Sequence, residues 1–138
     1  MGEHGSLASP VAHGWAQLKT LERHVLFESV TSAAMESALN ALSLRQRAIA
    51  NNIANVNTPG YQARRVDFES ALAASISQGS GEAVASTNRS LEPTRLDGSN
   101  VNLDTETLSN VDTLLRYQFA TQAASGTFSS IRTALKGS

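Results

Sequence analysis

Four asparagines lie within seven residues of this chain, in the segment ANNIANVNTPGY that spans residues 50–61. They are Asn51, Asn52, Asn55 and Asn57. Each carboxamide both donates and accepts hydrogen bonds. Inside a helix such side chains compete with the backbone for partners, so four of them together need a reason. The pattern predicts hydrogen-bonding chemistry, with amides that cap the last carbonyls of a helix.

The residues that most often carry catalysis are poorly placed for it. All three histidines lie within the first 24 residues, and the chain has no cysteine. This excludes a histidine-based triad, a histidine metal site or a thiolate nucleophile from the rest of the chain. Asp67 and Glu69 are two positions apart and do not share a helix face, so we interpret them as a cap and a surface charge. We expect neither an enzyme nor a cofactor nor a metal.

A long amphipathic helix is predicted to position the asparagines. Apolar residues recur every seven positions at Met35, Leu42, Ile49 and Val56, which indicates a helix from about residue 26 to residue 55.

The first helix is predicted to stop at Thr58-Pro59-Gly60. Pro59 disfavours helical geometry at Thr58, and Gly60 can take the positive φ of a type II turn. Tyr61 then leaves in a new direction.

A second amphipathic helix is predicted from Asp104, as its N-cap, to about Leu135. Glu106 lies in the first turn, where a carboxylate opposes the positive end of the helix dipole. The apolar positions at helical spacing are Leu108, Val111, Leu115, Phe119, Ala123 and Gly126.

Between the two helices we expect a brief extended segment, a short helix over residues 68–76 capped by Asp67, and a mobile loop over residues 77–100 with at most a short hairpin. The predicted fold class is all-α: two long terminal helices form an antiparallel, coiled-coil-like hairpin around an irregular middle with little or no β structure.

The chain divides into four segments: residues 1–25, 26–57, 58–100 and 101–138. The first is interrupted by glycines and Pro10, and we expect it to be flexible or foreign to the natural protein, with Val25 as an alternative start. A short helix over residues 16–23 is compatible with Leu18 and Leu21.

Bulk properties restrict the function further. The 138 residues suit one domain, and the net charge of −1 favours neither nucleic acid nor an anionic membrane. No apolar run approaches the roughly 20 residues that span a bilayer, so we expect no membrane insertion. Alanine is the commonest residue, and small side chains bury little area each. This composition suits a subunit that folds fully on assembly.

ANNIANVNTPGY, followed by Gln62, Ala63 and Phe68, resembles the N-terminal signature of the flagellar rod and hook family. The segments NVNLDTE (residues 100–106) and LRYQ (residues 115–118) resemble the proximal-rod branch. Asn102 departs from the aspartate common there. Fewer than 50 residues separate the predicted helices, which leaves no room for the β-rich domain of the distal-rod and hook proteins.

The resemblance implies a structural subunit of the basal-body proximal rod that transmits torque from the membrane ring to the distal rod. Implied partners are other copies of the chain, other rod subunits, the membrane-ring protein, the ring-to-rod adaptor and the type III export apparatus. Export would proceed without a cleaved signal peptide. The alternative is a coiled-coil adaptor or needle-like subunit of another secretion system, but such a protein would lack the asparagine-rich signature.

The candidate interface follows from the same resemblance. Its expected residues are Asn51, Asn52, Asn55, Asn57, Thr58, Pro59, Gly60, Tyr61 and Phe68. The amides would bond to a neighbouring subunit, and the two aromatic residues would anchor the contact, although a core role for them is equally compatible with the sequence. The basic residues around Arg45, Arg47, Arg64 and Arg65 are either solvated charges or intrahelical partners of Asp67 and Glu69, or they contact acidic residues of the next subunit.

Overall fold

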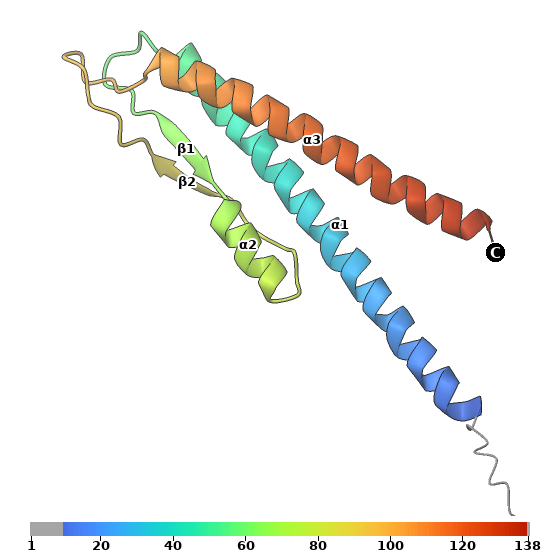
Figure 1. Ribbon diagram of the computed structural model, residues 1–138. Helices are drawn as coiled ribbons and strands as arrows, with labels where there is room; N and C mark the ends of the chain where they lie inside the picture. The colour runs from blue at the N-terminus through green and yellow to red at the C-terminus, as the bar shows by residue number, and fades with distance from the viewer. Residues whose placement is uncertain (1–9, 138) are drawn as a thin grey trace, which may run out of the picture.

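The computed structural model describes residues 10–137, with side chains from residue 14 onward. It contains α1 (Pro10–Ala54), β1 (Arg64–Asp67), α2 (Glu69–Ser77), β2 (Ser86–Arg89) and α3 (Leu103–Lys136). Helices α1 and α3 run antiparallel and side by side, while the two strands and α2 lie along another side of α1 (Figure 1). Helix α1 therefore contacts α3, β1 and α2. The predicted all-α class with two long terminal helices is confirmed.

Helix α1 begins at Pro10, well before the expected start near residue 26. The expected start was therefore wrong, because residues 10–25 belong to α1 and the short helix expected over residues 16–23 is part of it. Residues 1–9 lie outside the described part of the chain. The single Gly14 costs a helix only about 1 kcal/mol. Pro10 has the fixed φ that suits a first helical position, and good helix formers follow Gly14. Residues 14–29 are all exposed, so this part of α1 is not buried by any other part of the described chain.

A small antiparallel sheet forms where the sequence suggested a loop. Strand β2 pairs with β1 in the register Arg64 to Arg89 and Asp67 to Ser86. The loop over residues 77–100 was expected to hold at most a short local hairpin, whereas β2 pairs back to the extended segment that follows the turn. A backbone hydrogen bond from Ser90 N to Ala63 O, at 2.8 Å, extends the pairing by one step.

Two predicted helix caps were also wrong. Asp67 is the last residue of β1, so Phe68 stands at the N-cap of α2 and its N–H donates to Glu69 Oε2 at 3.2 Å. The N-cap of α3 is Asn102 rather than Asp104, because Asn102 Oδ1 accepts hydrogen bonds from Asp104 N and Thr105 N. Asn102 has extended backbone geometry, which is the geometry of an N-cap.

The core is small. Ala41, Leu42 and Phe68 form its buried centre. Packed around them are Ala38, Leu72, Ala85, Tyr117 and Ala120. Small side chains dominate this contact, so it brings α1, α2 and α3 close together but buries little apolar area. Among the described residues, no helix is both long and apolar enough to span a lipid bilayer.

Candidate functional site

The signature turn has the geometry that the sequence predicts. Gly60 has a φ of +73°, and Tyr61 N donates to Thr58 O at 3.2 Å. A positive φ strains any residue with a Cβ, so glycine is favoured at this position. The turn is also tied to the distant loop, since Gly60 N donates to Asp97 O at 2.9 Å. Thr58, Pro59 and Gly60 are exposed.

Asn52 lies at the junction of α1, β1 and α3 and is fully buried. Its Nδ2 donates to Arg64 O at 2.8 Å and to Glu106 Oε1 at 3.0 Å. Its Oδ1 accepts from Arg64 N at 3.0 Å and from the Tyr61 hydroxyl at 3.2 Å. These four bonds use the full capacity of the amide. Asn52 therefore joins three elements within one chain, whereas the sequence suggested a bond to another subunit.

The other three asparagines behave differently. Asn55 Nδ2 donates to Asn51 O at 2.8 Å, which supplies the predicted cap of a late helical carbonyl. Asn55 Oδ1 accepts from Thr58 Oγ1 at 3.1 Å and so links the helix end to the turn. The Asn51 and Asn57 side chains are exposed. Only these exposed amides are free to meet another molecule without rearrangement of the described chain.

The two candidate aromatic residues, Tyr61 and Phe68, also lie in different surroundings. Tyr61 is half-buried and uses its hydroxyl on Asn52. Phe68 is buried in the core, with the Arg45 guanidinium carbon 4.8 Å from its ring centroid. This distance suits a cation–π contact. Phe68 is therefore a core residue.

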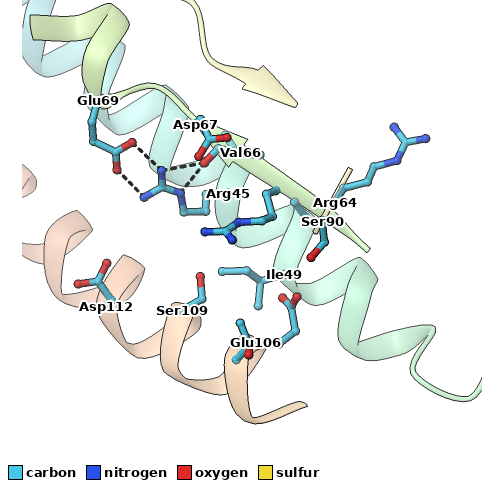
Figure 2. A pocket seen from close by; sticks show the side chains of 13 residues that line it. Arg45, Ile49, Arg64, Val66, Asp67, Glu69, Ser90, Glu106, Ser109 and Asp112 are labelled. Atoms are coloured by element: carbon cyan, nitrogen blue, oxygen red, sulfur yellow. Dashed lines mark hydrogen bonds and ion pairs between the residues drawn. The ribbon is translucent and has the colours of Figure 1, made fainter. Parts of the chain in front are cut away.

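Arg45 organises the start of α2. Its Nε and Nη2 donate to Val66 O at 2.9 and 2.8 Å, and its Nη1 lies 2.8 Å from Glu69 Oε1 (Figure 2). The hydrogen bond from Arg45 lowers the pKa of Glu69 from 4.5 to about 2, although burial acts in the opposite direction. Glu69 thus pairs with an arginine, but the pair joins α1 to α2 and is not the intrahelical pair that the sequence suggested.

Glu106 lies in the first turn of α3, as the sequence predicts, but its surroundings were not foreseen. It is buried, and burial raises the pKa of its carboxyl group above 4.5, against the hydrogen bond from Asn52 and the positive charge of Arg65. It lines a cavity of about 260 Å³ between α1, β1 and α3, together with Ile49 and Ser109 (Figure 2). Its position in a first turn suggested only a dipole contact. No sequence signal distinguished it from Asp104, which is exposed.

Helix α3 turns its polar and small residues toward α1. The positions of α3 that are buried or half-buried are Thr105, Glu106, Ser109, Thr113, Tyr117, Ala120, Ala123, Ala124, Thr127 and Ile131. Thr113 is fully buried, and Thr127 Oγ1 lies 4.0 Å from Met35 Sδ of α1.

The outer stripe of α3 consists of Leu108, Val111, Leu115 and Phe119. These side chains are between 51 and 74% exposed. At 100° per residue they lie on the helix face opposite Glu106 and Thr113. Leu108, Val111 and Leu115 therefore face away from α1, while the exposed Phe119 borders a groove that residues of α1 and α2 also line.

The described residues contain no group of three or more histidine, cysteine, aspartate or glutamate side chains that could hold a metal ion. The arrangement found is one of interlocked hydrogen bonds beside an exposed apolar helix face. Such an arrangement can fix a shape and bind a neighbouring protein.

Comparison with known proteins agrees with this description. Residues 34–62, which include the whole signature segment, match the family model described as flagella basal body rod protein. The chain is 36% identical over 113 residues to the flagellar basal body rod protein FlgB of Escherichia coli strain K12, covering 66% of this chain and 82% of that protein. It is 30% identical over 119 residues to FlgB of Bacillus subtilis strain 168, covering 75% of this chain and 91% of that protein.

FlgB of Aeromonas hydrophila is 31% identical over 116 residues, which cover 72% of this chain and 88% of that protein. These relatives are matched along most of their lengths, so the similarity extends well beyond the signature segment. The chain belongs to the FlgB family of flagellar basal body rod proteins.

Proposed function

We propose that this structural rod subunit packs laterally through the outer stripe of α3 and transmits torque along the proximal rod. Membership of the family makes it a structural component of the flagellar basal body that assembles with other rod components. The mechanical role is our extension of that statement. The single observation that carries it is the exposure of Leu108, Val111, Leu115 and Phe119.

The physical argument starts from the cost of exposed apolar area. Burial of a leucine or phenylalanine side chain is worth about 1.5–3 kcal/mol, and these four side chains form one continuous stripe. On a monomer such a stripe is a liability, whereas against a neighbouring subunit it supplies the main attraction. The polar side of α3 already serves the contact with α1, so the two faces of this helix have separate tasks.

The hydrogen bonds of Asn52, at the junction of α1, β1 and α3, would make the subunit stiff. A subunit that transmits torque must not bend where its helices meet the middle segment. The four hydrogen bonds of Asn52 and the ion pair of Arg45 with Glu69 hold α1, β1, α2 and α3 together at this end. We therefore assign these side chains to rigidity within the subunit. The function depends on interface geometry, because no bond is made or broken.

The proposal includes neighbours that the resemblance implies: the membrane-ring protein, the ring-to-rod adaptor and the next rod protein. It also includes delivery by the type III export apparatus without a cleaved signal peptide, and no enzymatic activity. These components would be found as neighbours of the chain in cross-linked basal bodies.

The experiment places a charge on the outer stripe. Leu115→Glu and Val111→Glu should leave the free energy of unfolding of the isolated chain within about 0.5 kcal/mol, because both side chains are exposed. The same variants should fail to restore motility and rod assembly in cells that lack the native protein, because a buried interface cannot accommodate an unpaired carboxylate.

The matched control is Leu91→Glu, since Leu91 is an exposed leucine in the loop after β2 and lies off the stripe. It should support normal assembly. Rods that assemble normally with both stripe variants would overturn the proposed lateral contact. Secretion of each variant into the medium separates a failure of assembly from a failure of export.

A further inference from the structure

An unpaired basic pair lies on the sheet. Arg64 and Arg89 are directly opposite each other in the register of β1 and β2, and both are exposed. Like charges at directly opposed positions of an antiparallel pair are destabilising. Within the described chain neither guanidinium has a carboxylate partner, and Asp67, the nearest acidic residue along β1, accepts from Asn88 Nδ2. The sheet therefore holds two like charges at opposed positions, and neither has an ion pair within the described chain.

The basic pair borders a hollow beside the signature turn. This hollow has a volume of about 480 Å³, and Gly60, Tyr61 and Gln62 form its other wall. The Tyr61 hydroxyl donates to Asn52, and Gln62 Nε2 donates to Gly98 O at 2.7 Å, so both polar groups are already engaged. The two arginines are thus the charged groups left to receive a ligand. Their chemistry selects carboxylates, which guanidinium groups bind with paired hydrogen bonds.

A complementary acidic pair lies elsewhere on the same chain. Glu36 of α1 and Glu82 of the loop after α2 are both exposed and line one hollow of about 230 Å³. Within the described residues, neither carboxylate has a hydrogen bond or ion pair to a side chain.

The loop that carries Glu82 is held against α1. Ser37 Oγ donates to Gly81 O at 3.1 Å and accepts from Ala83 N at the same distance. Glu82 is consequently held close to the surface of α1 that carries Glu36, so the acidic pair is a fixed feature of the fold.

We propose that Arg64 and Arg89 of one copy bind Glu36 and Glu82 of a second copy in a head-to-tail contact. This inference rests on the proposed function, in which copies of the chain pack together. Arg64 is bonded through its backbone to Asn52, and 16 residues of α1 separate Asn52 from Glu36, which places the two pairs about 24 Å apart along the helix axis. Because the two surfaces differ, each copy can bind the next by the same contact, which gives an open array where the rotation between copies does not close a ring.

The contact sets the axial register between copies more than the strength of assembly. Exposed ion pairs contribute little affinity individually, and charge complementarity mainly selects the correct partner and alignment. The apolar outer stripe of α3 supplies the attraction, while the charged pairs reject misaligned copies. An axial offset of about 24 Å between parallel copies brings the basic pair of one copy level with the acidic pair of the next.

The test is a charge exchange in the full-length chain. Arg64→Glu with Arg89→Glu should reduce the number of assembled rods by about tenfold, and Glu36→Arg with Glu82→Arg should do the same, because attraction becomes repulsion at two pairs. The chain that carries all four substitutions should recover assembly. Circular dichroism and thermal unfolding of each isolated variant verify that the fold is retained.

Each outcome is decisive. Recovery by the fourfold variant supports contact between copies. If Arg64→Glu with Arg89→Glu loses assembly and the fourfold variant does not recover it, the contact between copies is overturned. The arginines would then bind a different protein. Normal assembly with either double variant also overturns it. In both of these cases the stripe variants of α3 would still block assembly, so the proposed function would stand.

Discussion

Asn52 Nδ2 donates to Glu106 Oε1 at 3.0 Å, so a buried amide of α1 binds a buried carboxyl group of α3. The same amide binds both backbone groups of Arg64 in β1. One side chain thereby fixes how the two terminal helices and the sheet meet. A hydrogen-bonded joint of this kind is costly to break, because each partner left behind is a buried polar group without a bond.

Replacement of Asn52 should destabilise the chain. Asn52→Ala leaves Glu106, both backbone groups of Arg64 and the Tyr61 hydroxyl without this partner, and we expect a loss of about 3 kcal/mol in the free energy of unfolding. Urea denaturation followed by circular dichroism measures it. Asn51→Ala is the matched control, because Asn51 is the exposed neighbour and its side chain has no bond within the described chain. Equal losses in the free energy of unfolding for the two variants would show that the hydrogen bonds of Asn52 do not hold these elements together.

Glu106 should make stability decrease as the pH rises. Its pKa is raised in the folded chain, so its contribution is fully present below the ordinary value of 4.5 and is lost as the pH rises through the raised pKa. Glu106→Gln keeps an oxygen for Asn52 and removes the charge. The variant should therefore gain stability relative to the native chain as the pH is raised from 4.5 to about 7, as measured by denaturation at both values. If the difference in stability between Glu106→Gln and the native chain does not change with pH, Glu106 is not the source of the pH dependence.

Glu69 should have the opposite effect. Its pKa is lowered to about 2, so its contribution is present above 4.5 and is lost as the pH falls through about 2. The carboxylate is about half exposed, and solvent screening limits its contribution to about 1 kcal/mol. Glu69→Gln should cost that amount at about pH 7 and almost nothing at about pH 2. Arg116 and Asp112, an exposed pair four residues apart on α3, provide the control, and Asp112→Asn should cost less at neutral pH.

Gly81 should tolerate no side chain. It has a φ of +74°, and a Cβ there would lie 2.3 Å from Val30 O in the backbone of α1. Gly79 has a similar φ of +78° but open space around it, which makes Gly79→Ala a control for backbone strain alone. We expect Gly79→Ala to cost about 1 kcal/mol and Gly81→Ala at least about twice that, because the loop must leave α1. Hydrogen exchange at Ala83 N, which donates to Ser37 Oγ, would report the detachment. Equal losses of stability in Gly79→Ala and Gly81→Ala would show that the loop after α2 does not pack against α1.

Helix periodicity and turn chemistry are local properties, and they predicted both long helices and the turn at Gly60, although α1 begins at Pro10 rather than near residue 26. The seven-residue spacing of Leu42 and Ile49 predicted a helix, and these two residues are indeed buried. The positive φ of Gly60 followed from its place after Pro59. The caps at Asp67 and Asp104 were misread because an acidic residue near a helix start is a common signal that neighbouring residues can also satisfy.

The sequence by itself determined the two long helices, the turn after the first of them and the resemblance to rod proteins, because each depends on residues close together in the chain. The tertiary structure alone decided that Asn52 and Phe68 face inward, that β2 pairs with β1, and that the apolar stripe of α3 faces outward. A helical pattern shows which residues share a face, but it does not say which face meets α1. That choice depends on how Glu106 and Thr113 fit against distant parts of the chain, and it leaves Leu115 and its neighbours exposed, as the proposed contact between subunits requires.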